Sequence, residues 1–281
     1  MRGGRISRGW ALAKQSFAVL RADRSLLLFP VIAVPSAVAA VAIVMGPGVA
    51  LYAADAQEAF LIAFGVLTLY ALTLVTVFFN TALAAAAARS LGGEDTSVGT
   101  GLSAARSRLG VIAAWALVQT VVGIVISAIQ EAAGDSLVGR VLVGLVNFAW
   151  SAATFFVVPV IALEGTGPRD AFRRSVGLVR ERWGEGVVGT ASVSGVVFLV
   201  ALAPIAALAV PGVLLLQGDA DVAGAVLLGL AAVVLVAACL IGGTANAIFR
   251  VALYRYATDG VAVGGFRTAE LQQAFAAKRR G

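Results

Sequence analysis

The sequence predicts an all-α fold, a polytopic membrane helical bundle of six transmembrane helices arranged as three helical hairpins. Of the 281 residues, 60% are hydrophobic and only 13% are charged, which is about half the charged fraction of an ordinary soluble domain. The charged residues cluster between long uncharged stretches, and the basic ones fall almost entirely on alternate segments. These observations predict the fold class, the number of spans and their orientation.

Six stretches of 22 to 33 residues contain no Asp, Glu, Lys or Arg. A helix rises about 1.5 Å per residue, so about 20 residues cross a hydrocarbon core and each stretch holds one span. The stretches are continuously apolar, whereas barrel strands alternate polar with apolar residues. Within a single transmembrane domain, 1–281, the predicted spans are 26–46, 60–86, 110–130, 141–163, 188–212 and 223–249.

The first span resembles a signal peptide, but its basic region extends to Arg24. Its apolar run is also about twice the length of a signal-peptide core. We therefore expect it to remain uncleaved.

Basic residues between the spans predict the orientation. Of the 21 Lys and Arg residues, 20 lie on the alternate segments that include both chain ends, and only Arg140 lies on the other side. Because cytoplasmic loops are enriched in Lys and Arg, both termini should be cytoplasmic. This distribution explains the net charge of +6, so no nucleic-acid partner is expected.

Two cytoplasmic segments have the pattern of amphipathic helices that lie at the lipid headgroups. In residues 1–24, apolar residues recur every three or four positions at Ile6, Trp10, Ala13, Phe17 and Leu20. A later segment sets Phe172, Val176, Val179 and Trp183 against Arg169, Arg173 and Arg180. The cytoplasmic tail, 250–281, contains a further candidate from Phe266 to Lys278.

Short matching patterns suggest that one hairpin unit is present three times. A serine is followed five residues later by arginine at Ser16, Ser103 and Ser175, shortly before an odd-numbered span. An asparagine precedes arginine by nine residues at Asn80 and Asn246, in the first and third hairpins. These patterns predict a pseudo-threefold repeat.

The composition supplies no candidate catalytic, cofactor-binding or metal-ligating residue. The chain has no His, and its one cysteine, Cys239, lies in the last span, so His-based catalysis, a disulfide and the usual zinc sites are not expected. No charged residue lies within a predicted span, which argues against a proton-coupled pump. We expect a protein that is not an enzyme.

Neutral polar residues within the spans could line a polar path or could hydrogen-bond between helices, and we expect the second. They are Asn80, Gln119, Thr120, Asn147, Thr154, Thr244 and Asn246. Prolines leave two alternatives as well, since Pro47 and Pro211 could mark broken helices at a transport site or end their spans near the outer interface. We expect them to end the spans.

The densest motif runs from Pro159 to Gly184 and reads PVIALEGTGPRDAFRRSVGLVRERWG. It resembles an uncharacterised family, a domain of unknown function found in six-span bacterial integral membrane proteins. It is more distantly similar to the membrane domain fused to some glycerophosphodiester phosphodiesterases. The matching residues are Pro159, Glu164, Gly165, Ala171, Arg174, Ser175, Trp183 and Gly184.

The resemblance implies a multi-pass protein of the bacterial cell membrane and no established activity. The catalytic phosphodiesterase domain has no counterpart in this sequence, so hydrolysis is not expected. Within the motif, Glu164 is expected to pair with Arg173, Arg174 or Arg180 and hold the turn, at about 1 kcal/mol or less if solvated.

Two functions fit these observations. The first is a non-enzymatic membrane scaffold or accessory subunit that binds anionic lipid headgroups or another membrane protein through its basic cytoplasmic face. The docking residues would be Arg169, Arg173, Arg174, Arg180, Arg182 and Trp183. The alternative is a permease or exporter for a small weakly polar or lipidic molecule, without ion coupling.

Overall fold

A computed structural model describes residues 15–53, 58–134, 136–183, 193–217, 220–260 and 263, and this part of the chain is helical without strands. Residues 15–22 are helical. The elements that follow are η1 (Arg24–Leu27), α2 (Leu28–Ala53), α3 (Glu58–Leu91), α4 (Val98–Arg106), α5 (Leu109–Ala133), α6 (Leu137–Ala153), α7 (Val157–Glu164), α8 (Pro168–Trp183), α9 (Val193–Gln217) and α10 (Asp221–Asp259). Within these described residues, six segments are long and apolar enough to cross a membrane, which confirms the predicted fold class. They are Arg24–Tyr52, Ala59–Leu91, Leu109–Ala133, Leu137–Glu164, Leu199–Gln217 and Asp221–Asp259.

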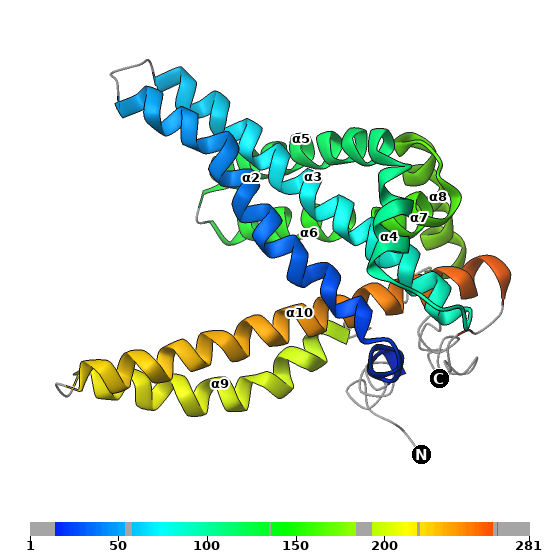
Figure 1. Ribbon diagram of the computed structural model, residues 1–281. Helices are drawn as coiled ribbons and strands as arrows, with labels where there is room; N and C mark the ends of the chain where they lie inside the picture. Colours follow the sequence, from blue (N-terminus) through cyan, green and yellow to red (C-terminus); the bar gives the residue numbers. More distant parts are fainter. Residues whose placement is uncertain are drawn as a thin grey trace.

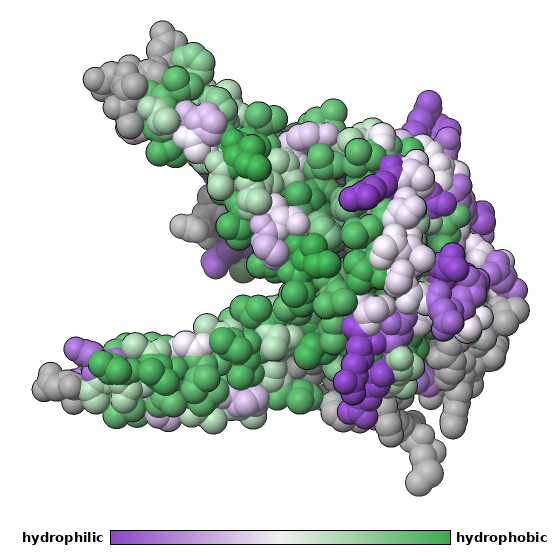
Figure 2. Space-filling view, in the orientation of Figure 1, coloured by the Kyte–Doolittle hydropathy of each residue, from purple (hydrophilic) through white to green (hydrophobic). Residues whose placement is uncertain are grey.

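The spans form hairpins whose tips point to one end of the molecule, while α4, α7 and α8 gather at the other end (Figure 1). The α2–α3 and α9–α10 hairpins diverge as two arms. Figure 2 shows an open wedge between these arms, which are covered by apolar residues, and hydrophilic residues concentrated around α4 and α8. We call this hydrophilic end, built from residues 15–27, α4, α7, α8 and the last turns of α10, the basic end.

The tightly packed core lies towards the basic end, where α7 and the last third of α10 pack against α3. Phe156, Ile161, Ile248 and Leu253 are fully buried there. The hairpin tips lack such packing, and Val222 is 80% exposed. Exposed apolar surface on this scale belongs in lipid.

Both proline-containing spans continue beyond the positions where we expected them to end. Helix α2 contains Pro35 and Pro47, and α9 contains Pro204 and Pro211, so the prediction that Pro47 and Pro211 terminate their helices is wrong. Membrane helices tolerate proline when neighbouring groups compensate for the missing N–H.

The glycines that follow Pro47 and Pro211 lie at close contacts between the two helices of their hairpins. A Cβ on Gly48 would lie 2.7 Å from Phe64 Cβ, and one on Gly212 would lie 3.3 Å from the Gly224 carbonyl oxygen. The Pro-Gly pairs therefore mark close helix packing in the first and third hairpins, since a larger side chain would separate the helices.

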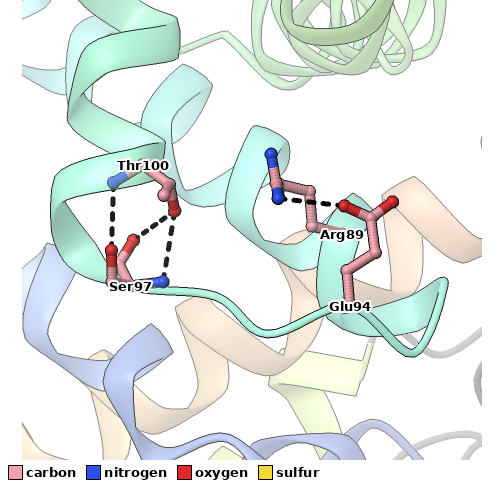
Figure 3. A network of polar contacts seen from close by, with 4 residues as sticks. All are labelled: Arg89, Glu94, Ser97 and Thr100. Carbon is pink, nitrogen blue, oxygen red and sulfur yellow. Dashed lines mark hydrogen bonds and ion pairs between the residues drawn. The ribbon is translucent and has the colours of Figure 1, made fainter.

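The α3–α4 turn is held by its own polar groups (Figure 3). Ser97 and Thr100 form a capping box in which Thr100 N donates to Ser97 Oγ at 3.2 Å and Ser97 N donates to Thr100 Oγ1 at 3.1 Å. Arg89 Nη2 lies 3.0 Å from Glu94 Oε2. These contacts satisfy backbone donors at the start of α4 and fix the turn that precedes it.

A second contact joins this turn to the start of the first span. The Asp23 carboxylate accepts bonds from Ser25 N at 3.1 Å, from Ser25 Oγ at 2.6 Å and from the Thr96 hydroxyl. Burial alone would raise the pKa of Asp23, but these hydrogen bonds outweigh it and lower the pKa below its ordinary value.

The predicted N-terminal amphipathic helix is described only from residue 15. Phe17 and Leu20 pack against the core, whereas Ile6, Trp10 and Ala13 lie outside the described residues, as does the candidate helix 266–278. Helix α10 extends to Asp259, so its last turns include the first residues of the predicted tail, 250–281.

The threefold repeat stays a prediction. Ser16 and Ser175 are buried, but Ser103 is exposed. In its favour, a left-handed glycine follows the second helix of every hairpin, at Gly93, Gly165 and Gly260. Left-handed glycine is a common helix terminator, so this similarity is compatible with a repeat without requiring one.

Candidate functional site

The family-like motif surrounds a break in the fourth span. Helix α6 ends at Ala153 and α7 begins at Val157, because Pro159 cannot donate a backbone bond and its ring crowds the carbonyl of residue 155. The break frees the N–H of Phe156, which donates to Ser175 Oγ of α8 at 3.0 Å. Two motif residues thus act together. Pro159 interrupts the helix, and Ser175 accepts the hydrogen bond that the Phe156 N–H donates.

The end of α7 is tied to two other helices through Glu164. Arg174 Nε of α8 lies 3.4 Å from Glu164 Oε1, which confirms the predicted pairing of Glu164 with a nearby arginine. The same oxygen accepts a hydrogen bond from the Tyr254 hydroxyl of α10. The Arg174 side chain is 50% exposed, but Tyr254 is 4% exposed, so the tyrosine bond is the better shielded of the two.

Gly165 turns the chain from α7 towards α8. Its φ of +68° is a left-handed conformation that favours glycine. A Cβ here would also lie 3.3 Å from Arg108 Nε, so the guanidinium covers the end of α7, where a cation is favoured by the helix dipole.

Arg108 is itself partly buried. Burial lowers its pKa, and within the described residues its Nη1 atom has no hydrogen-bond partner, as is also true of the buried Thr166 Oγ1. Arg108 is therefore a packing residue of the turn and is less accessible than the arginines on the outer face of α8.

Helix α8 is fastened to the bundle by an aromatic cluster. The Phe172 ring lies 5.8 Å from that of Trp150 and 6.4 Å from that of Trp115, measured between centroids. Trp115 is 1% exposed and Ala171 is fully buried. The apolar face of α8, which we expected at the lipid headgroups, thus packs in part on α5 and α6.

A second arginine, Arg250 of α10, is also partly buried. The Arg250 guanidinium carbon lies 4.7 Å from the centroid of the Phe155 ring, a cation–π distance. Phe155 belongs to the segment between α6 and α7. The break in the fourth span is therefore covered by α10 on one side and by Ser175 of α8 on the other.

The predicted docking residues divide into two groups. Arg169, Arg173 and Arg180 are exposed and form no ion pair within the described part of the chain, whereas Arg174 is paired with Glu164. The side chains of Arg182 and Trp183, and all of Gly184, lie outside the described residues. Among the docking residues whose side chains the structure describes, only the first group offers free positive charge.

An open pocket of about 400 Å³ lies along α8 beside the end of α7. Its lining combines acidic and basic side chains with a short apolar floor: Glu164, Thr166, Asp170, Arg173, Arg174, Gly177, Leu178 and Glu181. The pocket contains no aromatic side chain among its described lining residues.

The neutral polar residues of the spans are used mainly within their own helices. Thr120, Thr154 and Thr244 donate to the carbonyl four residues earlier, at 2.8 to 2.9 Å. Asn147 Nδ2 does the same to Val143 O at 3.0 Å. These bonds differ from the interhelical bonds we expected, and they give no support to a polar transport path.

Comparison with known families matches residues 60–265 to the model of a family of unknown function, DUF6159. The chain belongs to this family. No curated protein matches it. The DUF6159 match contains the α6–α7 break, the α7–α8 turn and Tyr254, and it confirms the expected membership in a family of unknown function. The similarity to the phosphodiesterase membrane domain stays a prediction.

Sequence reasoning missed Tyr254 and Arg250 as parts of this site. Each lies just beyond a predicted span, where a single Arg or Tyr has the pattern of an ordinary boundary residue. A weak signal was present on α10, since Arg250 and Tyr254 are four residues apart and so share one helix face.

Proposed function

We propose that this protein is a non-enzymatic membrane scaffold or accessory subunit whose basic end docks on anionic lipid headgroups. The observation that supports the proposal is the unpaired positive charge at the basic end. Six exposed arginines form no ion pair within the described residues: Arg21, Arg24, Arg106, Arg169, Arg173 and Arg180.

These arginines come from three different elements at one end of the fold, namely the start of the first span, α4 and α8. Near an anionic leaflet each contributes about 1 kcal/mol of attraction, which decays over a Debye length of about 8 Å. Three of them therefore contribute about 3 kcal/mol, or a factor of about 100 in binding. Arg108, Arg174 and Arg250 contact other residues of the fold and are not counted here.

The test uses arginines that touch neither the Glu164 contacts nor the pocket lining. The double variant Arg169→Gln/Arg180→Gln should retain several-fold less phosphatidylglycerol than the parent after purification from phosphatidylcholine/phosphatidylglycerol nanodiscs, and the difference should shrink as salt is raised. Arg169→Lys/Arg180→Lys keeps both charges and should behave like the parent.

Arg140→Gln removes a charge from the opposite end and is a second control. Equal retention of phosphatidylglycerol by the parent and the double Gln variant would overturn lipid docking by α8. A protein partner would then be the better explanation of the exposed arginines.

A further inference from the structure

The α8 pocket differs in charge from the basic end that surrounds it. Among the residues that the structure describes, its lining has three carboxylates, Glu164, Asp170 and Glu181, and two arginines, Arg173 and Arg174. Arg174 lies 3.4 Å from Glu164, so this pair is internally neutral. Asp170, Glu181 and Arg173 remain, and within the described chain none of them forms an ion pair. A simple anion would therefore meet one more negative charge than positive charge.

From this arrangement we infer that the pocket binds a zwitterionic lipid headgroup in which a primary ammonium and a phosphate are joined by a short linker. This inference rests on the proposed lipid docking of the basic end and adds a headgroup preference at one position. The ammonium bonds to Asp170 and the phosphate bonds to Arg173.

The spacing of these two side chains suits such a group. Asp170 and Arg173 are three residues apart in α8 and both line the pocket, so their Cβ atoms are about 5 to 6 Å apart. An ammonium and a phosphate separated by two carbons span a similar length. Asp170 and Glu181 are about 16 Å apart along the helix axis, which is too far for both to ligate one metal ion.

The lining also favours a primary over a quaternary ammonium. Carboxylates accept N–H hydrogen bonds from a primary ammonium, whereas quaternary ammonium groups are recognised by aromatic cages. No aromatic residue lines the described pocket. Ethanolamine-type headgroups therefore fit better than choline-type headgroups.

The position of the pocket identifies the membrane as the source of this ligand. Glu164 is the last residue of the fourth span, Leu137–Glu164. Its carboxylate therefore lies where the hydrocarbon core gives way to headgroups. Leu178 supplies apolar surface on the pocket floor, which a lipid would contact and a free polar metabolite would not need.

Gly177 allows the pocket to be closed without altering its charges. A Cβ at Gly177 meets no atom within 4 Å, so Gly177→Leu adds its side chain from an open position in the pocket lining, and it replaces a poor helix former by a good one. Gly110, which also has open space and does not line the pocket, provides the matched control Gly110→Leu.

The experiment compares lipids retained from nanodiscs made of equal parts phosphatidylethanolamine and phosphatidylcholine, measured by native mass spectrometry of the full chain. The parent and Gly110→Leu should retain phosphatidylethanolamine in preference by about fivefold, the factor that an exposed ion pair can contribute. Gly177→Leu and Asp170→Asn/Glu181→Gln should both lose this preference. A parent without the preference, or a Gly177→Leu variant that keeps it, overturns the inference.

A parallel arm in phosphatidylglycerol separates this inference from the proposed function. Gly177→Leu should retain phosphatidylglycerol like the parent, whereas Arg169→Gln/Arg180→Gln should lose it and keep the phosphatidylethanolamine preference. Loss of both lipids in Gly177→Leu would show that the pocket is part of one nonselective surface and would overturn the headgroup assignment.

Discussion

The Tyr254 hydroxyl of α10 donates a hydrogen bond to the Glu164 carboxylate at the end of α7, 90 residues earlier in the chain. Through this bond the last span holds the turn that leads into α8, which Arg174 holds from the other side. The motif around Glu164 thus has a structural function, since it connects α7, α8 and α10.

Replacing Tyr254 by Phe removes the hydroxyl but leaves the Glu164–Arg174 ion pair. We expect the free energy of unfolding to fall by about 1.5 to 3 kcal/mol, the usual contribution of a hydrogen bond to a charged group. Unfolding in mixed detergent micelles, followed by circular dichroism, measures this loss. Tyr70→Phe is the control, because Tyr70 Oη lies 3.4 Å from the Ala113 carbonyl oxygen, and equal losses in both variants would contradict the prediction.

Ser175→Ala should destabilise the protein by about 1 to 3 kcal/mol, because the buried Phe156 N–H loses its partner. Ser103→Ala, at an exposed position of α4, should change stability by less than about 0.5 kcal/mol. In a Pro159→Ala background the helix can close over the break, so the cost of Ser175→Ala should shrink. Additive effects in this double-mutant cycle would show that Pro159 and Ser175 act independently.

Gly101→Ala should loosen α4. A Cβ at Gly101 would lie 2.5 Å from Phe29 Cζ and 2.7 Å from the Ala82 carbonyl oxygen, and such overpacking costs about 1 to 3 kcal/mol. Gly99→Ala, in the same helix, meets only Ser97 Oγ at 3.6 Å and should stabilise by up to about 1 kcal/mol. Thermal unfolding of the two variants should shift in opposite directions, and a parallel shift would rule out this packing account.

Thr96→Val should destabilise the protein in a pH-dependent way by removing a bond to Asp23. Hydrogen bonds lower the pKa of the folded Asp23, whereas an unfolded Asp has a pKa of about 3.9. The stabilising effect is therefore complete above about pH 4 to 5 and is lost as pH falls through the folded pKa.

We expect Thr96→Val to cost about 1 to 2 kcal/mol at pH 7, and less when unfolding is measured in acid. Thr76→Val removes a bond within α3 and should show no comparable pH dependence. A Thr96→Val loss that stays constant into acid would show that ionised Asp23 is not the acceptor that matters.

Reporter fusions test the predicted topology. Fusions at Gly134 and Asp219 should report the outside, and fusions at Gly93, Gly167 and the C-terminus should report the cytoplasm. Of the 21 basic residues, 20 lie in the segments that we predict to be cytoplasmic and one lies on the other side. Such an asymmetry orients short loops during insertion. A single reversed loop would be incompatible with six alternating spans.

The spans were predictable because each depends only on local composition, with a charged residue near each end. The Glu164–Arg174 pair was predictable for a related reason, since the two residues are ten positions apart across one turn. Tyr254 was not, because its bond to Glu164 depends on how α10 packs against α7. Hydropathy carries no information about this packing.

The errors have physical causes too. Pro47 and Pro211 were expected to end helices, as proline does in water, but both lie within helices. The apolar residues of α8 were assigned to lipid because periodicity identifies an apolar face without identifying what covers it. Phe172 is covered by Trp115 and Trp150.

In a bilayer we expect acyl chains to fill the wedge between the α2–α3 and α9–α10 arms, because apolar side chains of these arms such as Ile43 and Val233 are exposed. Chains enclosed between two protein walls should reorient more slowly than chains in the surrounding bilayer. We therefore expect the protein to carry a small ordered region of lipid between its arms. The length and saturation of those chains should affect the distance between the arms, just as bilayer thickness affects the tilt of a single span.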